Sequence, residues 1–197
     1  PCAFNPEPLA DFFDFFVLGE GEEVILEIAT LLREKKSRKL SRRETLLALA
    51  GIEGIYVPSF YQASYHPDGR VSAISPSVEG VPATVKKCLV RSLEDAFYPV
   101  EQIVPYTETV HDRVALEIFR GCTRGCRFCQ AGYVYRPVRN RSRDLCADSF
   151  VRSCDDTRYH EVTPSSLSTR DYPPLTDLCD ELDPFCAPRH VSLSPPT

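Results

Sequence analysis

The segment from Val114 to Gly132 reads VALEIFRGCTRGCRFCQAG, an apolar strand that runs directly into a loop with three cysteines. Cys122, Cys126 and Cys129 have the spacing C-x3-C-x2-C, and such short spacers let one loop wrap its thiolates around a single centre. Three thiolates are one fewer than a structural zinc or a fully cysteine-ligated cluster uses. The residues therefore favour an iron–sulfur cube with one iron open to an outside ligand, with zinc as the weaker alternative.

The cysteine count points to a reducing compartment. The chain has 9 Cys, and an odd number with one tight cluster does not suit a disulfide scaffold. We therefore expect a cytoplasmic protein. The cysteines outside the loop are expected to be small, half-buried hydrophobic residues. They are Cys2, Cys88, Cys146, Cys154, Cys179 and Cys186.

Composition narrows the class of protein further. Hydrophobic residues make up 43% and charged residues 26%, which is ordinary for a globular protein and excludes collagen-like and disordered chains. No apolar run approaches the roughly 18 to 20 residues that span a bilayer. The net charge of -5 gives no general attraction to nucleic acid. The chain starts at Pro1 and has no Met, which indicates a fragment or a processed chain.

Strands and helices alternate on both sides of the cysteine loop, which predicts βα units and a parallel sheet. Phe15 to Leu18 has the pattern of a buried parallel strand, and two helices follow. The second helix opens with the capping-box spacing of Ser41 and Glu44. Beyond the loop, Ser142 can cap a helix, followed by a strand over 161–168, a helix over 175–182 and a strand over 191–193. The apolar stripe expected on the first helix is Val24, Ile25, Ile28, Leu31 and Leu32.

The middle of the chain changes character. Residues 55–80 predict a β-hairpin with a turn at Pro67-Asp68-Gly69. The sequence from Gly80 to Tyr106 contains several prolines and no regular pattern, as in a connector between domains. We therefore expect three parts, which cover residues 1–52, 53–108 and 109–197.

The loop and its surroundings resemble a known family. Arg120–Gly132 is similar to the signature of radical S-adenosylmethionine (radical SAM) enzymes, C-x3-C-x-aromatic-C, with Phe128 in the aromatic place. Val110–Arg113 and Arg136–Arg139 resemble the B12-binding-domain-containing radical SAM proteins, an uncharacterised subfamily, and Pro1–Glu23 resembles the end of their cobalamin-binding-like domain. The resemblance implies an α/β fold: a partial radical SAM (β/α) barrel preceded by the C-terminal remnant of a Rossmann-like cobalamin-binding-type domain.

This resemblance implies an enzyme in which Cys122, Cys126 and Cys129 hold a [4Fe-4S] cluster. Its open iron would chelate S-adenosylmethionine, and an electron from a flavodoxin- or ferredoxin-type donor would cleave that cofactor to methionine and a 5′-deoxyadenosyl radical, which abstracts hydrogen from a substrate. The sulfurs of the three cysteines should then converge on one point beyond the end of the Val114–Phe119 strand, as barrel active sites do. The sequence does not specify the substrate; RNA is one candidate, because related groups modify RNA.

The resemblance also implies residues that bind the cofactor, namely Phe128, Arg139 with Arg141, Ser168 with Thr169, and Asp171. Phe128 would place its backbone or ring against the adenine, although simple packing explains it equally well. Asp171 would contact the cofactor's amino group from the loop after the second strand, or serve as a helix cap. The two arginines would pair with a carboxylate or phosphate, or belong to a solvated face.

Some features depart from the family pattern. Pro164 removes a hydrogen-bond donor from what should be a central strand. From Cys122 onward the chain is far shorter than the about 250 residues of a full eightfold barrel, so we expect this piece not to form a finished active site alone. His66 is the nearest match to the cobalt-binding D-x-H-x-x-G, but Ser64 replaces its Asp and the hairpin indicates a turn role. Cobalamin is thus expected only in a full-length parent.

A second function class stays open at this point. The run from Arg33 to Arg43 is strongly basic, and further arginines surround the cysteine loop. They permit a non-catalytic iron–sulfur or zinc binding module that contacts RNA or a protein partner. A charge run is more often a solvated helix face. Cleavage of S-adenosylmethionine separates the two functions.

Overall fold

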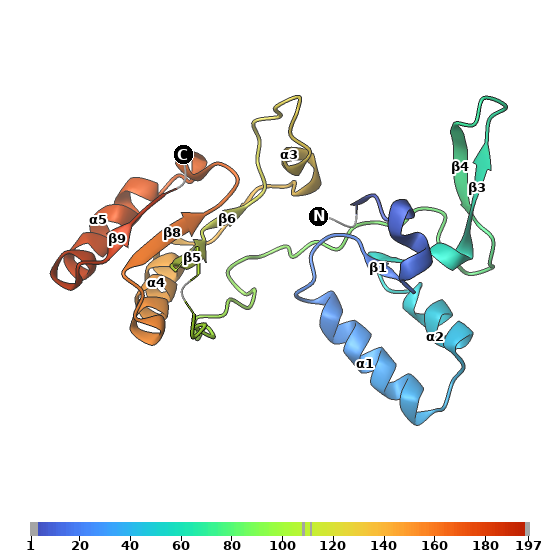
Figure 1. Cartoon of the computed structure of the whole chain (residues 1–197), viewed down its shortest axis with the longest axis horizontal. Helices are drawn as coiled ribbons and strands as arrows, with labels where there is room; N and C mark the ends of the chain where they lie inside the picture. Colours follow the sequence, from blue (N-terminus) through green and yellow to red (C-terminus); the bar gives the residue numbers. More distant parts are fainter. Residues whose placement is uncertain (1–3, 108, 111, 196–197) are drawn as a thin grey trace. The chain divides into compact units, whose positions relative to one another are not determined.

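The apolar residues of the chain form two separate hydrophobic cores, one in each of two units, Pro1–Val90 and Arg91–Thr197. The structure is a computed structural model that describes residues 4–107, 109–110 and 112–195 (Figure 1). Cys2 and His111, for which the sequence made predictions, lie outside these residues. In the described part of the chain, each helix is too short or too polar to reach across a lipid bilayer.

Two helices supply part of the first unit's core. Helix α1 (Val24–Ser37) buries Val24 and Ile28, and α2 (Arg42–Leu49) buries Leu49. The predicted stripe on α1 is too wide, because Ile25 and Leu32 are 55% and 40% exposed. Neighbours such as Val24 and Ile25 point about 100° apart on a helix, so a single covering layer reaches only one of them.

The capping box that opens α2 is confirmed. The hydroxyl of Ser41 accepts a hydrogen bond from the backbone N–H of Glu44, and the Glu44 carboxylate accepts one from the backbone N–H of Ser41 at 2.9 Å. The basic run from Arg33 to Arg43 therefore spans the end of α1 and the start of α2, and its Lys35 and Lys36 lie in the last turn of α1, where they offset the helix dipole.

The direction of the first strand was predicted wrongly. Strand β1 (Phe16–Val17) pairs antiparallel with β2 (Ile55–Tyr56), not parallel. Two helices lie between the strands, where a parallel βαβ unit has one, and the extra helix reverses the direction in which the chain returns. Short 3₁₀ turns, η2 (Glu7–Phe12) and η3 (Pro58–Phe60), flank this pair.

The predicted hairpin is confirmed as β3 (Tyr61–Tyr65) paired with β4 (Val71–Pro76). Its turn is closed by the backbone of His66, whose N–H donates to the Arg70 carbonyl at 2.8 Å, and Gly69 has a φ of +83°. His66 therefore serves the turn, as expected. After β4, the described residues as far as β5 form no helix or strand, in keeping with their prolines.

The second unit contains the predicted parallel sheet. Strands β5 (Val114–Glu117), β8 (Glu161–Ser165) and β9 (Ser192–Leu193) lie in the order β5-β8-β9, and α4 (Arg143–Thr157) and α5 (Leu175–Cys186) make the crossovers (Figure 1). The described strands do not close a barrel. The turns η4 (Thr169–Asp171) and η5 (Ala187–Arg189) border α5. The Rossmann-like remnant expected before this unit stays a prediction.

Both helices cover one face of the sheet, and three of the scattered cysteines take part. Cys146 and Cys154 of α4 and Cys186 of α5 are buried, so they act as the small hydrophobic residues that the sequence predicted. The other members of this core are Val114, Leu116, Ile118, Phe119, Ala147, Phe150, Val162, Tyr172, Leu178 and Leu182. Cys88 and Cys179 are half-buried.

Pro164 lies in the central strand β8 without breaking a ladder bond. The last pair between β8 and β9 is Val162 with Leu193, and the Val162 carbonyl accepts from the N–H of Ser194. In a parallel strand, alternate residues bond to opposite neighbours, so the Pro164 nitrogen faces the β9 side just past that last pair. The missing donor therefore falls where the partner strand has ended.

The strand before the cysteines is interrupted at Ile118. Strand β5 ends at Glu117, and a second short strand, β6 (Phe119–Arg120), pairs antiparallel with β7 (Arg139–Asn140). The N–H of Ile118 donates to the Ser165 carbonyl of β8, and its own carbonyl accepts from the N–H of Arg141. Ile118 is therefore the residue at which the chain leaves the parallel sheet and enters the β6–β7 strand pair that closes the cysteine loop.

Candidate metal centre

The cysteine loop is a closed segment at the carboxyl end of β5. The pairing of Phe119 with Asn140 and of Arg120 with Arg139 joins its two ends, and the segment between them contains the short helix α3 (Ala131–Val134). All three predicted ligands lie on this one loop. The carboxyl end of a parallel strand is where ligands bind in α/β sheets.

Gly121 makes the tight base of this loop possible. Its φ is +99°, and a Cβ there would lie 2.7 Å from the Pro137 carbonyl oxygen and 2.9 Å from that of Tyr135. Gly125, between the first two cysteines, has a φ of +65°. Both positions need the conformational freedom of glycine.

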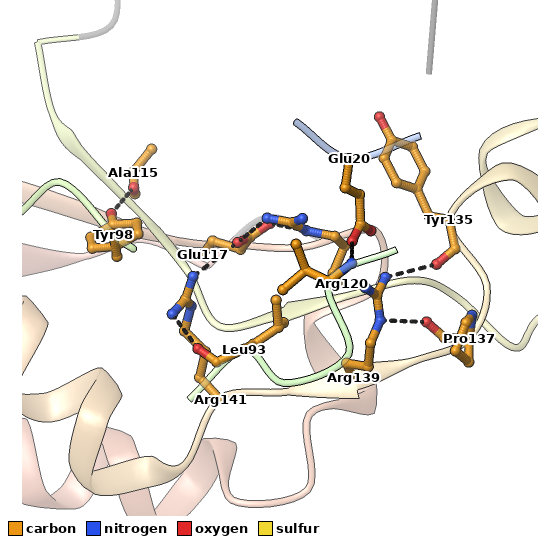
Figure 2. A network of polar contacts seen from close by, with 11 residues as sticks. Glu20, Leu93, Tyr98, Ala115, Glu117, Arg120, Tyr135, Pro137, Arg139 and Arg141 are labelled. Atoms are coloured by element: carbon orange, nitrogen blue, oxygen red, sulfur yellow. Dashed lines mark hydrogen bonds and ion pairs between the residues drawn. The ribbon is translucent and has the colours of Figure 1, made fainter. Parts of the chain in front are cut away.

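Arginines bind the carbonyl groups of the loop. The Nε of Arg136 donates to the Cys122 carbonyl at 3.2 Å. The Nε and Nη2 of Arg139 donate to the carbonyls of Pro137 and Tyr135 at 3.1 and 3.4 Å (Figure 2). Arg139, predicted as an anion ligand, therefore supports the return arm of the loop in this structure.

The three cysteine side chains of the loop differ in exposure. Cys126 is exposed, and Cys122 and Cys129 are half-buried. The Cys122 sulfur accepts a hydrogen bond from the backbone N–H of Arg124 at 3.4 Å, and the N–H of Cys129 donates to the Cys126 carbonyl at 3.0 Å.

The predicted convergence of the sulfurs is not found. Among the described residues, no three His, Cys, Asp or Glu side chains are arranged to hold a metal ion. The spacing places the three thiols on one loop, but the turns of that loop decide where each sulfur points. The donor set itself, three thiols with glycine-rich backbone around them, fits an iron–sulfur cluster better than it fits a hard cation.

Phe128 lies between the second and third cysteines and is 91% exposed. The alternative of simple core packing therefore does not describe this ring. An exposed aromatic side chain beside three thiols is available to a flat ligand.

The loop after β8 reaches the cysteine loop through Asp171. Its carboxylate accepts hydrogen bonds from Nε of Arg124 at 2.7 Å and from Nη2 of the same guanidinium, and a third from the Ser168 hydroxyl at 2.8 Å. The Arg124 guanidinium and then the Ser168 hydroxyl hold the pKa of Asp171 below its usual range. The structure thus brings together two predicted site residues, Ser168 and Asp171, with Arg124, which the sequence analysis did not single out. The only signal for Arg124 was its position between two cysteines.

Arg141 is buried and not part of a solvated face. It is 3% exposed; its Nη1 donates to the Leu93 carbonyl at 2.7 Å, and its Nη2 lies 3.3 Å from Oε2 of Glu117 (Figure 2). Glu117 also accepts two hydrogen bonds from Arg120, at 2.9 and 2.8 Å. The guanidinium of Arg141 lies over the Tyr98 ring. These contacts fix the connector to the carboxyl end of β5.

A cavity of about 250 Å³ opens at the carboxyl ends of β5 and β8, beside the first cysteine. Its lining residues are Glu117, Phe119, Arg120, Gly121, Tyr135, Ser165, Ser166 and Leu167. A larger hollow of about 580 Å³ lies in the first unit against α2, and no residue of the cysteine loop lines it, whereas Gly121 and Tyr135 of that loop line the smaller cavity. The smaller cavity is therefore the one that the chemistry of the loop selects.

Comparison with known proteins supports the resemblance. An uncharacterized protein of Methanocaldococcus jannaschii is 30% identical over 186 residues, which cover 93% of this chain and 34% of that protein. The chain thus spans about a third of the length of this curated relative. No solved structure matches the chain. Residues 1–58 match the family described as radical SAM proteins, N-terminal, and this match supports the predicted resemblance of the chain to the radical SAM superfamily.

Proposed function

We propose that this chain is the part of a radical SAM enzyme that holds a [4Fe-4S] cluster through Cys122, Cys126 and Cys129. The observation that carries the proposal is the closed C-x3-C-x2-C loop at the carboxyl end of a parallel strand. When bound, such a cluster supplies the electron that cleaves S-adenosylmethionine reductively to methionine and a 5′-deoxyadenosyl radical.

The residues of the chain would prepare the site for that chemistry. Gly121 and Gly125 let the backbone bend around a bulky group, and the backbone N–H of Arg124 donates a hydrogen bond to the Cys122 sulfur. Phe128 offers an exposed ring for the adenine of the cofactor. Ser168 lies on the loop after β8, within reach of the same region through Asp171. Arg139 would act indirectly, by holding the loop backbone.

The cavity beside the loop would receive the polar part of a ligand. Its lining combines the carboxylate of Glu117 and the guanidinium of Arg120 with the hydroxyls of Ser165 and Ser166. Such mixed polar groups suit a zwitterion better than a purely apolar molecule. The two charged groups bind each other across 2.8 Å, so the ligand would meet an ordered pair.

The test is anaerobic reconstitution of the full-length protein with iron and sulfide. We expect bound iron and sulfide, an electron paramagnetic resonance signal after reduction, and 5′-deoxyadenosine when S-adenosylmethionine is added. Serine at each loop cysteine should abolish all three. Cys179→Ser is the matched control, because Cys179 is half-buried and remote from the loop in sequence.

Two outcomes would reject the proposal. Zinc in place of iron would reject the cluster and favour the non-catalytic module. A protein that forms the cluster but releases no 5′-deoxyadenosine would reject the enzyme and keep the metal site.

A further inference from the structure

Asp171 and Arg124 connect two loops of the second unit that are 47 residues apart in sequence. Arg124 lies between Cys122 and Cys126, and Asp171 follows the central strand β8. Both side-chain nitrogens of the guanidinium fork that face Asp171 donate to its two oxygens. This two-point contact fixes orientation as well as distance.

The Asp171 end of the contact is rigid. Asp171 is the last residue of η4, and its N–H donates to the Ser168 carbonyl at 2.8 Å. On one side Thr169 is 3% exposed, with its hydroxyl 3.0 Å from that of Ser166. On the other side Tyr172 is 1% exposed, and its hydroxyl donates to the Arg141 carbonyl at 3.0 Å. The carboxylate is therefore held by the core of the unit.

The Arg124 end of the contact is not fixed by the core. Arg124 and its neighbours from Thr123 to Phe128 are exposed or half-buried, and Gly125 adds backbone freedom. The strand pair β6–β7 restrains the ends of the loop, some residues away from Cys126. The side chain of Arg124 thus joins the free tip of the loop to a fixed point, and its own N–H bonds the Cys122 sulfur.

We infer that Asp171 is a positioning residue that fixes the cysteine loop through Arg124, instead of a direct ligand of the cofactor's amino group. The inference rests on the proposed function, since it concerns how the same loop retains a cluster. Its basis is that both Asp171 oxygens already accept hydrogen bonds from the arginine and one accepts another from Ser168. Residues that orient metal ligands typically change metal affinity about 10- to 100-fold when they are replaced.

The experiment measures iron loss from the reconstituted full-length protein to a chelator, followed by visible absorption. Asp171→Asn and Arg124→Gln should each lose iron about 10-fold faster than the unmodified protein. The double variant should be no faster than either single one, because the two residues act as a unit. Arg124→Lys, which keeps the charge, should restore part of the retention. The electron paramagnetic resonance signal of the reduced cluster should broaden in the variants that lose the pair.

The matched control is Arg127→Gln, which removes another arginine of the same loop, one with no ion pair among the described residues. It should retain iron like the unmodified protein. Circular dichroism verifies that each variant is folded, and Ser168→Ala, which weakens the contact without removing the carboxylate, provides a milder second test.

The outcomes separate this inference from the proposed function. Failure of the unmodified protein to bind iron refutes the function itself. Normal iron retention in Asp171→Asn, with weaker binding of S-adenosylmethionine to the loaded protein, overturns the positioning role and makes Asp171 a cofactor ligand. Additive effects of the two substitutions, or an equal effect of Arg127→Gln, also overturn it.

Discussion

Replacing Gly121 with Ala should open the base of the cysteine loop. The φ of +99° is a region that costs a residue with a side chain about 1–3 kcal/mol. The added Cβ would also lie within 3 Å of three backbone atoms, in Pro137, Tyr135 and Val138. Overpacking of this kind costs about 1–3 kcal/mol more. The sum, about 2–6 kcal/mol, is a large part of the stability of an ordinary domain.

Hydrogen exchange followed by mass spectrometry measures this locally. Peptides that cover residues 119–140 should exchange faster in Gly121→Ala, because the β6–β7 pair must separate to admit the methyl group. Peptides from the first unit should not change. The same variant should take up less iron than the unmodified protein.

Substitutions at two further glycines separate the backbone cost of Gly121→Ala from its steric cost. Gly132→Ala adds a methyl group in α3 whose nearest neighbour is the Cys122 Cβ at 4.0 Å, so it should cost nothing. Gly69→Ala has a φ of +83° with open space around it, so it should cost only the backbone term of about 1–3 kcal/mol. Unchanged exchange in Gly121→Ala, or equal opening in Gly132→Ala, would refute the steric argument.

Three other predictions concern single side chains. Arg141→Met should lower the free energy of unfolding of the second unit by about 2–3 kcal/mol, because charge-assisted hydrogen bonds to Leu93 and Glu117 are lost; an unchanged denaturant midpoint would contradict this. Burial raises the pKa of the Cys154 thiol from 9.0 to about 11, so the stability that this buried thiol contributes should be complete below pH 9.0 and lost as pH rises toward 11. Alkylation near neutral pH should modify Cys126 before Cys154, because Cys126 is exposed and Cys154 is buried. Phe128→Ala should change stability by less than about 0.5 kcal/mol but weaken binding of S-adenosylmethionine to the loaded protein; equal binding would remove the ring from the site.

Local signals predicted most of the elements of the fold. The capping box at Ser41, the turn at Gly69 and the strand patterns of the second unit depend on residues that are close in sequence, and the structure confirms them. Helix α5 was predicted to end at Leu182 but extends to Cys186. Pro184 lies within the helix and does not end it. The position of the cysteine loop at the end of β5 was also predicted, because the strand and the loop are contiguous in the sequence.

Tertiary contacts account for what the sequence did not predict. Nothing near Phe16 indicates that its partner strand returns antiparallel, because that depends on how two helices pack. The burial of Arg141 depends on Leu93 and Glu117, which lie far from it in sequence. The directions of the cysteine sulfurs depend on turns that the spacing leaves open.

The arginines around the cysteine loop bear on the choice between the two function classes. As a set they would favour nucleic acid, yet in the structure Arg120 binds Glu117, Arg124 binds Asp171, and Arg139 binds carbonyls of its own loop. Each of these guanidiniums thus holds a backbone segment or a carboxylate of the same unit in place. A phosphate would have to displace those partners, and a displaced carboxylate would repel it. These three arginines therefore support the shape of the loop, and support for an RNA-binding module comes instead from the separate basic run from Arg33 to Arg43.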